Sequence, residues 1–513
     1  QHRSVRSMAR SLLAFACLPI LVAFTPNANA APGADSAFQL LNAGFESPLA
    51  DKPGAPSDWY KAGPGTGFSL DTEVQRSGRN SLRLERTDGT AFTAVSQSLP
   101  AASVRGQVVA LRAWLRAERD GTGGGALMLV AMNGERKSVA FAQSESDGLP
   151  SAGDWQRVEL RLLVPVNAES ISIGFRHAGS GALWIDDASV ATWSLDQAEP
   201  LSAAAGSYLN EAISLVQKSA LYAARVDWPT VTRQAHALAA GAMTTGDTYA
   251  AIRHVLRQLG DGHSFLATPS QAARSSATAA PSIAAIRWRE VQSQAVVSLP
   301  GFASTDPGRS DEYAARVREV LAEAAANRCG LILDLRENIG GNLFPMLAGL
   351  APLVADGAVG GLATADGQST QWRFVDGSFV STAADRTDTA PYNALPFKRI
   401  GDGVAPLAVL IGPKTASSGE AVAIALVGRA NARSFGAPTA GQTTGNRGVT
   451  LADGARLAIT TSVMLDRSGQ RYGGKLQPDE NVSPAAAPAA PTTLDPVLTA
   501  AATWLRQHPA CHK

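Results

Sequence analysis

Apolar and polar residues alternate in short runs through the first part of the chain, between residues 38 and 193. A period of two is typical of β-strands that bury one face, and glycine and aspartate separate the runs as turn residues do. We find no convincing helical period in this stretch. The pattern therefore predicts an all-β sandwich over residues 38–193. Its clearest strands are expected at residues 81–84, 108–111, 126–130, 158–162 and 171–175.

The spacing of apolar residues becomes helical over residues 205–265, which we expect to form a helical cap. Apolar residues from Tyr208 to Val216 fall on one face of a first helix. Asp227, with Pro229 two positions later, is typical of a helix start. A third helix is expected to end at Gly260, because glycine commonly terminates helices.

From residue 284 to residue 510, buried strands alternate with helices. This order predicts crossover units and a mainly parallel or mixed sheet, and thus an α/β core. Strands are expected at 295–299, 331–333 and 406–411, helices from Ser310 to Leu321, 344–354 and 418–427, and a loop at 270–282.

Composition limits the class of protein. The chain has 513 residues, of which 45% are hydrophobic and 17% charged, so it can bury the cores of several domains. Its net charge of +1 gives no basic surplus, and nucleic acid is therefore not the expected partner. Only 3 cysteines are present, too few for a disulfide scaffold or a multi-cysteine zinc site.

The first 30 residues resemble an export signal. Arg10 precedes an apolar run at 12–24, and the small residues of Ala28-Asn29-Ala30 provide a cleavage site. A membrane anchor is the alternative, although the run is short for a membrane span. We therefore expect an exported protein in the periplasm or outside a bacterial cell. Of the two cysteines beyond the signal, Cys329 is expected as a buried thiol. A bridge to Cys511 is the open alternative, although no spacing rule supports it.

Three segments combine residues that can carry out chemistry. They are LGDGHSF at 259–265, LILDLRENIGGN at 331–342 and VLIGPKTASSGEAVAIAL at 409–426. In the third, Ser417 lies between a buried strand and a helix, where unpaired N–H groups and the positive helix end favour a nucleophile whose attack creates an oxyanion. The alternative is structural, because Ser417 and Glu420 also have the spacing of a capping box.

The other two segments contribute backbone donors and a base. Gly340 and Gly341 permit positive φ and close approach, so their N–H groups can face an oxyanion. A tight turn with Asp334 and Arg336 as an ion pair is the alternative. His263 lies in a polar turn and can accept a proton from a serine near neutral pH, although a lone turn histidine is more often structural.

In this order, the three segments resemble the tail-specific, or C-terminal-processing, serine protease family in its tricorn-like branch. The matching stretches are ILDLRENIGG, TASSGE at 415–420 and GAPTAGQTTGN at 436–446, within a resemblance over roughly 205–485. The resemblance implies a ClpP/crotonase-like core, a peptide or protein substrate, and no metal or organic cofactor. It also implies Ser417 as nucleophile, with an oxyanion hole from Ser418 and from Gly340 or Gly341.

The chain departs from the family pattern in its base and its architecture. Members with a Ser–Lys dyad have lysine where this chain has Gln442, so His263 is the implied base, as in the tricorn-like branch. Tyr472 stands where that branch has a glutamate. The group that orients His263 is therefore open among the candidates Glu420, Asp466 and Asp261, in falling order. The short segment between His263 and the strand at 295 leaves no room for a PDZ domain.

The N-terminal sandwich resembles galactose-binding-like jelly-roll modules. The stretches that carry this resemblance are LNAGFE at 41–46, SGRNSLRL at 77–84, DWQRVEL at 154–160 and ALWIDDASV at 182–190. It implies carbohydrate as a ligand. Trp59, Trp114, Trp155 and Trp184 are candidates for stacking on sugar, with a place in the core or at its edge as the favoured alternative. Asp186 and Asp187 are candidates for calcium, with structural hydrogen bonding favoured.

Taken together, these features predict an exported serine peptidase, with Ser417 as nucleophile and His263 as general base. Two alternatives remain open. One is a non-catalytic peptide- or glycan-binding protein on a protease-like core. The other is an esterase that acts on decorated polysaccharide.

Overall fold

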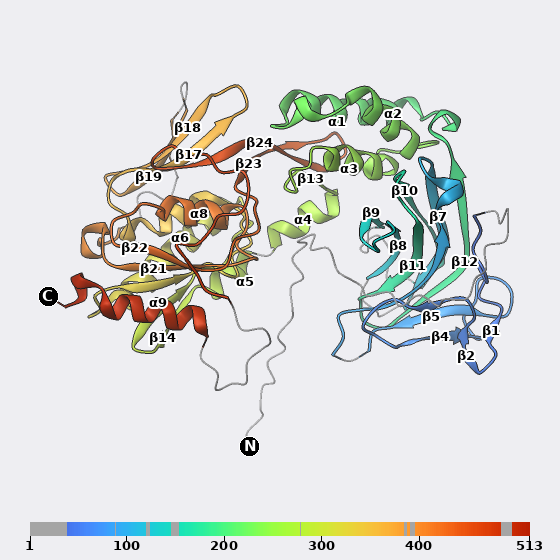
Figure 1. Ribbon diagram of the computed structural model, residues 1–513, viewed down its shortest axis with the longest axis horizontal. Coiled ribbons are helices and arrows are strands. Elements are labelled where there is room, and N and C mark those ends of the chain that lie inside the picture. Colours follow the sequence, from blue (N-terminus) through green and yellow to red (C-terminus); the bar gives the residue numbers. More distant parts are fainter. Residues whose placement is uncertain are drawn as a thin grey trace, which may run out of the picture. The chain divides into compact units, whose positions relative to one another are not determined.

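The computed structural model describes residues 38–87, 89–118, 124–144, 153–277, 279–383, 387–389, 396–483 and 495–512 (Figure 1). The described chain divides into two compact units. One contains residues 38–213 and 227–255, and the other contains 214–226 and 256–512. This division passes through the predicted helical cap. The domain boundaries inferred from the sequence stay predictions.

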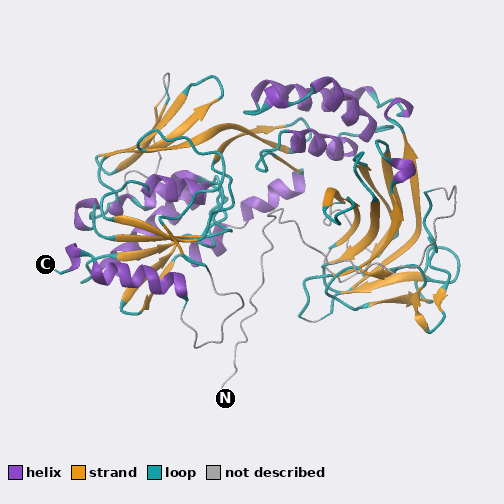
Figure 2. Ribbon diagram, viewed as in Figure 1, coloured by secondary structure: helices purple, strands orange, loops and turns teal. Residues whose placement is uncertain are grey.

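Two antiparallel five-stranded sheets form most of the first unit (Figure 2). The first, in the order β10-β7-β12-β5-β4, contains β4 (Phe68–Asp71), β5 (Ser81–Glu85), β7 (Val108–Ala117), β10 (Gln156–Leu163) and β12 (Ala182–Trp193). The second, in the order β3-β6-β11-β8-β9, contains β3 (Tyr60–Lys61), β6 (Thr93–Pro100), β8 (Gly125–Met132), β9 (Ser138–Gln143) and β11 (Ser170–His177). A separate hairpin pairs β1 (Pro48–Leu49) with β2 (Lys52–Pro56).

The sheets confirm the β-rich character that the alternation in the sequence predicted for this unit. Each of the five predicted runs lies within a strand, and alternate residues of each run belong to the core between the sheets. Leu82, Leu84 and Leu111 from one sheet share a core with Ile171 and Phe175 from the other. The jelly-roll assignment stays a prediction.

Helices follow the sandwich, starting with α1 (Ala203–Ser219), α2 (Trp228–Leu238) and α3 (Tyr249–Gln258). The expected start of α2 is confirmed, because Asp227 is its N-cap and accepts a hydrogen bond from the Thr230 N–H at 3.3 Å. The loop expected at 270–282 is wrong. The chain there forms α4 (Pro269–Ala277) and α5 (Ala279–Ala284).

The alanine and serine residues of this segment suggested a loop, but several of them favour α4. Alanine has the highest helix propensity. Thr268 and Gln271 also cap the start of α4 reciprocally, with the Thr268 N–H donating to Gln271 Oε1 at 3.0 Å and the Gln271 N–H to Thr268 Oγ1 at 3.3 Å. The sequence analysis overlooked this cap.

The second unit is built on a six-stranded mixed sheet in the order β14-β15-β16-β21-β22-β25. Its strands are β14 (Arg287–Val291), β15 (Gln294–Ser298), β16 (Leu331–Asp334), β21 (Leu407–Ile411), β22 (Ala432–Gly436) and β25 (Glu480–Asn481). Only the β14–β15 pair is antiparallel. The strands β15, β16 and β21 were expected from their apolar runs.

Helices cover both faces of this sheet (Figure 1). One face packs on α6 (Pro307–Ala325), α7 (Leu343–Gly349) and α8 (Ser418–Leu426), and the other on α9 (Pro496–Gln507). Alternate residues of each strand separate accordingly: Leu333 and Val409 face the first layer, Ile332 and Ala408 the second. The helix start expected at Ser310 is wrong, because α6 begins at Pro307 and Asp306 is its N-cap.

A second sheet in this unit has the order β13-β24-β17-β18-β19-β20, with β23 also paired to β24. Its strands are β13 (Phe265–Ala267), β17 (Gly357–Thr364), β18 (Ser369–Val375), β19 (Ser378–Thr382), β20 (Thr387–Thr389), β23 (Thr444–Thr450) and β24 (Arg456–Asp466). None of the strands of this sheet was predicted from the sequence. It matters for function because β13 follows His263 directly and β23 begins at Thr444.

Cys329, just before β16, and Cys511, after α9, form a disulfide, with their Cα atoms 5.2 Å apart. The expectation of a free buried thiol at Cys329 is therefore wrong. The bond joins residues 182 positions apart in sequence and connects the segment before β16 to the end that follows α9. Spacing could not reveal it, because the fold alone brings these two ends together.

Within the described residues, no helix has the length and apolar character needed to cross a membrane. The predicted export signal at residues 1–30 and Cys17 lie outside the described residues.

Candidate active site

Ser417 lies where the chain passes from β21 into α8, and its backbone is strained. Its φ is 51° and its ψ is −120°, a conformation that a residue with a side chain seldom adopts. Such outliers occur where the surrounding structure enforces them, often in a sharp strand-to-helix turn that exposes a nucleophile. Ser417 is the N-cap of α8 and forms the predicted capping box with Glu420, so the structural alternative is also present. Its strained backbone nevertheless differs from that of an ordinary N-cap residue, which usually has extended angles.

The Gly340–Gly341 turn lies directly against Ser417. Gly340 has a φ of 97°, and a Cβ added to it would lie 2.8 Å from the Ser417 Cβ and 3.0 Å from the Ser418 nitrogen. Gly341 has a φ of 124°, and its Cβ would lie 2.1 Å from the Phe302 carbonyl oxygen. Both positions therefore require glycine, and the predicted proximity of this turn to the serine is present.

The two glycines differ in what their N–H groups do. The Gly340 N–H already donates to Asn338 Oδ1 at 2.9 Å, so Gly340 is not a free oxyanion donor in this structure. The N–H groups of Gly341 and Ser418 have no hydrogen-bond acceptor among the described residues. The Ser418 hydroxyl donates to the Gly341 carbonyl at 2.6 Å, which holds these two residues together. The geometry therefore favours Gly341 and Ser418 as the donor pair.

Asn338 shapes this turn and was not singled out from the sequence. It is fully buried, and its side-chain amide donates to the Leu299 carbonyl at 3.1 Å. Its own carbonyl accepts from the Ala416 N–H at 3.0 Å. Gly419 makes this approach possible, because a Cβ there would lie 2.5 Å from the Asn338 carbonyl oxygen. Asn338 thus fastens the glycine turn to the segment that carries Ser417.

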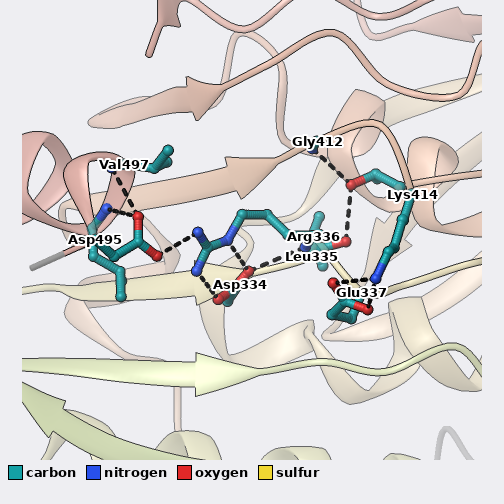
Figure 3. A network of polar contacts seen from close by, with 10 residues as sticks. Asp334, Leu335, Arg336, Glu337, Gly412, Lys414, Asp495 and Val497 are labelled. Atoms are coloured by element: carbon teal, nitrogen blue, oxygen red, sulfur yellow. Dashed lines mark hydrogen bonds and ion pairs between the residues drawn. The ribbon is translucent and has the colours of Figure 1, made fainter. Parts of the chain in front are cut away.

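A network of polar contacts connects the same two segments further from the serine (Figure 3). The Thr415 hydroxyl donates to the Leu335 carbonyl at 2.9 Å, and the exposed Lys414 pairs with Glu337 at 2.9 Å. Arg336 pairs with Asp334 at 2.7 Å and with Asp495, the N-cap of α9, at 2.6 Å. The Asp334–Arg336 ion pair, which the sequence offered as an alternative role for this segment, coexists with the glycine turn.

His263 is buried, with 8% of its surface exposed, and its imidazole Nδ1 lies 2.7 Å from Thr444 Oγ1. Its backbone is held on both sides. The N–H donates to Asp261 Oδ1 at 2.9 Å, and the carbonyl accepts from Asn446 Nδ2 at 2.9 Å. Burial lowers the pKa of His263 to about 4, and the nearby Asp261 carboxylate acts in the opposite direction. The imidazole is therefore neutral at physiological pH, as a general base must be.

Glu420 connects the serine segment to the histidine segment. Its carboxylate accepts from the backbone N–H groups of Ser417 at 2.9 Å, Gly441 at 2.9 Å and Gln442 at 2.8 Å, and from the Thr439 hydroxyl. The Gln442 side chain then donates to the Gly262 carbonyl, next to His263, at 3.2 Å. Burial raises the pKa of Glu420, while these hydrogen bonds lower it.

None of the three acids proposed to orient His263 is hydrogen-bonded to its imidazole. Glu420 binds backbone groups of the neighbouring loops, as described above. Asp466 binds Ser468, Gln470 and Tyr472 at the end of β24, and Asp261 caps its own turn through His263 N–H and Ser264. The imidazole partner is Thr444 instead. The sequence could not reveal this partner, because a threonine lacks the charge by which the three carboxylates were predicted.

Within the described chain, no hydrogen bond joins the Ser417 hydroxyl to His263. Histidine, cysteine and acidic side chains form no group of three or more that could hold a metal ion among these residues. The site thus consists of a strained serine, two free backbone donors and a buried neutral imidazole.

Comparison with known proteins agrees with this chemistry. Residues 293–482 match the model of Peptidase family S41. This stretch of the chain is therefore similar to the S41 serine peptidases. The match includes Ser417, Glu420 and the glycine turn, whereas His263 precedes it.

Individual proteins are similar to this chain over more residues than the 293–482 match. The nisin-resistance protein of Lactococcus lactis subsp. lactis is 28% identical over 270 residues, which is 52% of this chain and 79% of that protein. Among solved structures, a lipoprotein from Streptococcus agalactiae has 24% identity, covers 60% of this chain and 97% of its own, and has a TM-score of 0.48. A photosystem II D1 C-terminal processing protease has 17% identity, covers 60% and 98%, and has a TM-score of 0.38.

In the N-terminal unit, the tryptophans have separate roles. Trp59 is 3% exposed and packs between Phe45 and Phe175, which makes it a core residue. Trp184 is also buried and donates to Asp71 at 2.8 Å. Trp114 lies on the outer side of its sheet, with the Arg76 guanidinium 3.9 Å from the centre of its ring.

Asp186 and Asp187 do what the structural alternative predicted. Asp186 is fully buried and accepts the backbone N–H groups of Arg76 at 2.8 Å and of Ser77 at 3.1 Å. Asp187 pairs with the Arg76 side chain and accepts from the Ser77 hydroxyl at 2.7 Å. Burial raises the pKa of Asp186, although these backbone hydrogen bonds lower it. Both carboxylates therefore hold the loop around residue 76, and calcium is not required to explain them.

Proposed function

We propose that this protein is an exported serine peptidase in which Ser417 attacks a peptide carbonyl and His263 is the general base. The observation that carries the proposal is the strained backbone of Ser417 beside two unoccupied N–H donors, those of Ser418 and Gly341. A structural cap needs neither the strain nor the glycine turn held against it. A nucleophile needs both, because its attack places a negative oxygen within reach of those donors.

The reaction proceeds in two halves. Ser417 Oγ bonds to the carbonyl carbon while its proton passes to His263 Nε2, and the Ser418 and Gly341 N–H groups hold the resulting oxyanion. The C–N bond then breaks as the imidazolium returns the proton to the leaving amine. Water, deprotonated by the same imidazole, attacks the acyl-enzyme and releases the acid and free Ser417. Catalysis requires Ser417 Oγ to come within hydrogen-bond distance of Nε2 when substrate binds, and such contacts are often looser in the free enzyme.

Export is supported by the disulfide as well as by the N-terminal sequence. A bond such as Cys329–Cys511 forms and persists in oxidising compartments and is rare in the cytosol. Fractionation of cells that express the full chain tests this location, and a reduced, cytosolic protein would contradict it. The short segment between His263 and β15 further supports a peptidase without a PDZ domain. Substrate selection would then depend on the surroundings of Ser417, on the helical cap or on the N-terminal sandwich.

Labelling with a fluorophosphonate tests the catalytic assignment without a known substrate. We expect the wild-type protein to be labelled at Ser417, Ser417→Ala to show no labelling, and His263→Ala to be labelled at least about 10³-fold more slowly. Ser369→Ala is the matched control, because Ser369 is an exposed serine on β18 and the variant should still be labelled like the wild type. Equal labelling of the wild type and Ser417→Ala would overturn the proposal and favour a binding protein.

A comparison of substrates separates the peptidase from the esterase. Peptide libraries and acetylated polysaccharides should be offered to the wild type and to Ser417→Ala. Nisin belongs in the panel, because the Lactococcus relative is named for resistance to it. We expect loss of peptide bonds that depends on Ser417. Release of acetate without peptide cleavage would assign the site to the esterase.

Carbohydrate binding by the N-terminal unit is a separate proposal. It is supported by a pocket of about 250 Å³ on the outer side of one sheet, lined in part by Trp114, Arg112 and Arg157. Aromatic rings with polar neighbours are suited to stacking on sugars. Electrophoresis through gels that contain polysaccharide should show retardation of the wild type but not of Trp114→Ala. Unchanged mobility of the wild type in every gel would contradict it.

A further inference from the structure

The imidazole of His263 is held by a residue that carries no charge. Thr444 Oγ1 lies 2.7 Å from Nδ1, and both side chains are buried, with exposed fractions of 4% for Thr444 and 8% for His263. The hydrogen bond joins residues 181 positions apart in sequence. Nε2, the other ring nitrogen, makes no hydrogen bond to any described residue. The ring is thus held through one nitrogen and leaves the other available.

Strand β23 holds His263 at two points. Thr444 binds the ring, and Asn446, two positions later, donates to the His263 carbonyl at 2.9 Å. Asn446 is itself fixed, because its Oδ1 accepts from the Thr460 hydroxyl on β24 at 2.9 Å. The Ser264 hydroxyl accepts from the Thr460 backbone N–H at 2.9 Å and so ties the residue after His263 to the same strand. Side-chain hydrogen bonds thus hold the imidazole ring and the backbone of His263 and Ser264.

Strand β23 has an irregularity directly after Thr444, which affects the direction of its side chains. The register between β23 and β24 shifts between Gly445 and Asn446. Such bulges are common beside active sites, where they change the direction of a side chain. A Cβ at Gly445 would lie 2.4 Å from the Ser462 hydroxyl, so a larger residue there would require Ser462 to move. The chain directly after Thr444 is therefore closely packed as well.

We propose that Thr444 is the positioning residue of the catalytic base: its hydroxyl accepts the Nδ1–H of His263 and keeps the lone pair on Nε2 for Ser417. This inference rests on the proposed function and names the third member of its relay. A histidine can take the serine proton only through a nitrogen that carries no hydrogen, so the partner of the other nitrogen decides which tautomer is present. In many relays that partner is a carboxylate, whereas here the acceptor is neutral.

A neutral acceptor has a predictable consequence. A hydroxyl fixes the ring and its tautomer but stabilises the imidazolium less than a carboxylate does. The low pKa of His263 agrees with a site that offers the imidazolium little compensation for burial. Thr444 should thus contribute through orientation and tautomer, and its removal should slow the chemical step without weakening the binding of the probe.

The first test compares three variants of β23 in the full chain. Thr444→Val keeps the shape of the side chain and removes the hydroxyl, Thr444→Ser keeps the hydroxyl, and Thr450→Val removes an exposed hydroxyl at the other end of the strand. We expect Thr444→Val to lower the maximal rate of fluorophosphonate inactivation by roughly 10- to 100-fold, the size typical of second-sphere partners. The KI of the probe should stay unchanged. Thr444→Ser and Thr450→Val should remain within about threefold of the wild type.

The second test reads the tautomer directly. In protein labelled with ¹⁵N-histidine, the ring of His263 is assigned by its absence in His263→Ala. We expect the wild-type ring to carry its hydrogen on Nδ1 and the Thr444→Val ring to shift toward the Nε2–H form. This measurement on the wild type needs no variant at position 444, so it applies even where Thr444→Val fails to fold.

The outcomes separate this inference from the proposed function. A wild-type Nε2–H tautomer, or an unchanged inactivation rate in folded Thr444→Val, overturns the role of Thr444 even when Ser417→Ala abolishes labelling. Loss of labelling that Thr444→Ser does not restore also overturns it, because the hydroxyl is then not responsible. Labelling of Ser417→Ala at the wild-type rate would instead overturn the proposed function, whatever the tautomer.

Discussion

The two halves of the candidate active site are built by different means. The serine half is made by backbone: the Ser417 turn and the Gly340–Gly341 turn meet through main-chain groups and through the buried amide of Asn338. The histidine half is made by side chains, because Thr444 and Asn446 hold His263 from a neighbouring strand. Geometry that is made by backbone depends on a few glycines and cannot adapt. Geometry that is made by side chains depends on single hydroxyl and amide groups, which can be removed one at a time.

The largest effect should follow from a change in the glycine turn. Gly341→Ala places a Cβ 2.1 Å from the Phe302 carbonyl oxygen at a φ of 124°, so the turn must move away from Ser418. We expect inactivation by fluorophosphonate to slow by roughly 10²- to 10³-fold, as it does when an oxyanion donor is lost. Gly367→Ala is the control, because its Cβ would meet nothing within 4 Å, although its φ of 85° is also positive. Similar rates for both variants would contradict a backbone-made serine half.

The next largest effect should come from Glu420, which joins the halves. Glu420→Gln puts an amide NH₂ among donors that now share one carboxylate, so at least one buried N–H loses its acceptor. An unmade buried hydrogen bond costs about 1–3 kcal/mol. We expect a lower melting temperature together with slower labelling of Ser417. The comparison is with Glu312→Gln, an exposed partner of Arg309. A stability loss no larger than that control's would show that Glu420 does not connect the halves.

The pH dependence tests the histidine half. The folded-state pKa of His263 is lowered from 6.5 to about 4, so the imidazole stays unprotonated down to that pH. The labelling rate should therefore hold through pH 5 and fall as pH decreases through about 4. Because the unfolded chain binds this proton more readily, the same group also makes stability decrease as pH falls from 6.5 toward 4. Circular dichroism at each pH separates the two effects. A labelling midpoint near 6.5 would contradict burial as the main influence on this base.

The smallest effect should come from the surface ion pair in Figure 3. Lys414 and Glu337 connect the two segments of the serine half, yet their side chains are 62% and 77% exposed. Exposed pairs contribute at most about 1 kcal/mol. Lys414→Met should leave the labelling rate within about twofold and the melting temperature almost unchanged. A larger loss of rate would mean that side chains position the serine half too.

This contrast explains what could be anticipated from the residues. Ser417, the glycine turn and the capping spacing of Glu420 lie in short contiguous stretches, where a strand, a turn and a helix follow one another. Local pattern therefore predicted the mixed sheet, three of its six strands (β15, β16 and β21) and the serine half. It failed at 270–282, where the Thr268–Gln271 cap was overlooked, and at Cys329, whose partner lies at the far end of the chain.

The histidine half shows where local pattern stops being informative. His263 could be named as a base because its turn resembles a family motif, but its partner could not be named. Asp466 and Asp261 were chosen because they carry charge, and each serves its own turn. Gly340 was predicted as an alternative oxyanion donor to Gly341, because the sequence does not show which N–H group already has a hydrogen-bond acceptor.

The sequence by itself determined the alternation of the N-terminal strands, the α/β character and three central strands of the core, and the serine and glycines of the candidate nucleophile turn. These features arise from contacts between residues near one another in the chain. Only the tertiary structure decided that Thr444 holds His263, that Gly341 and Ser418 are the free donors, and that Cys329 pairs with Cys511. Those contacts join residues 77 to 182 positions apart, and a pairing at such distance depends on how the sheets bring strands together.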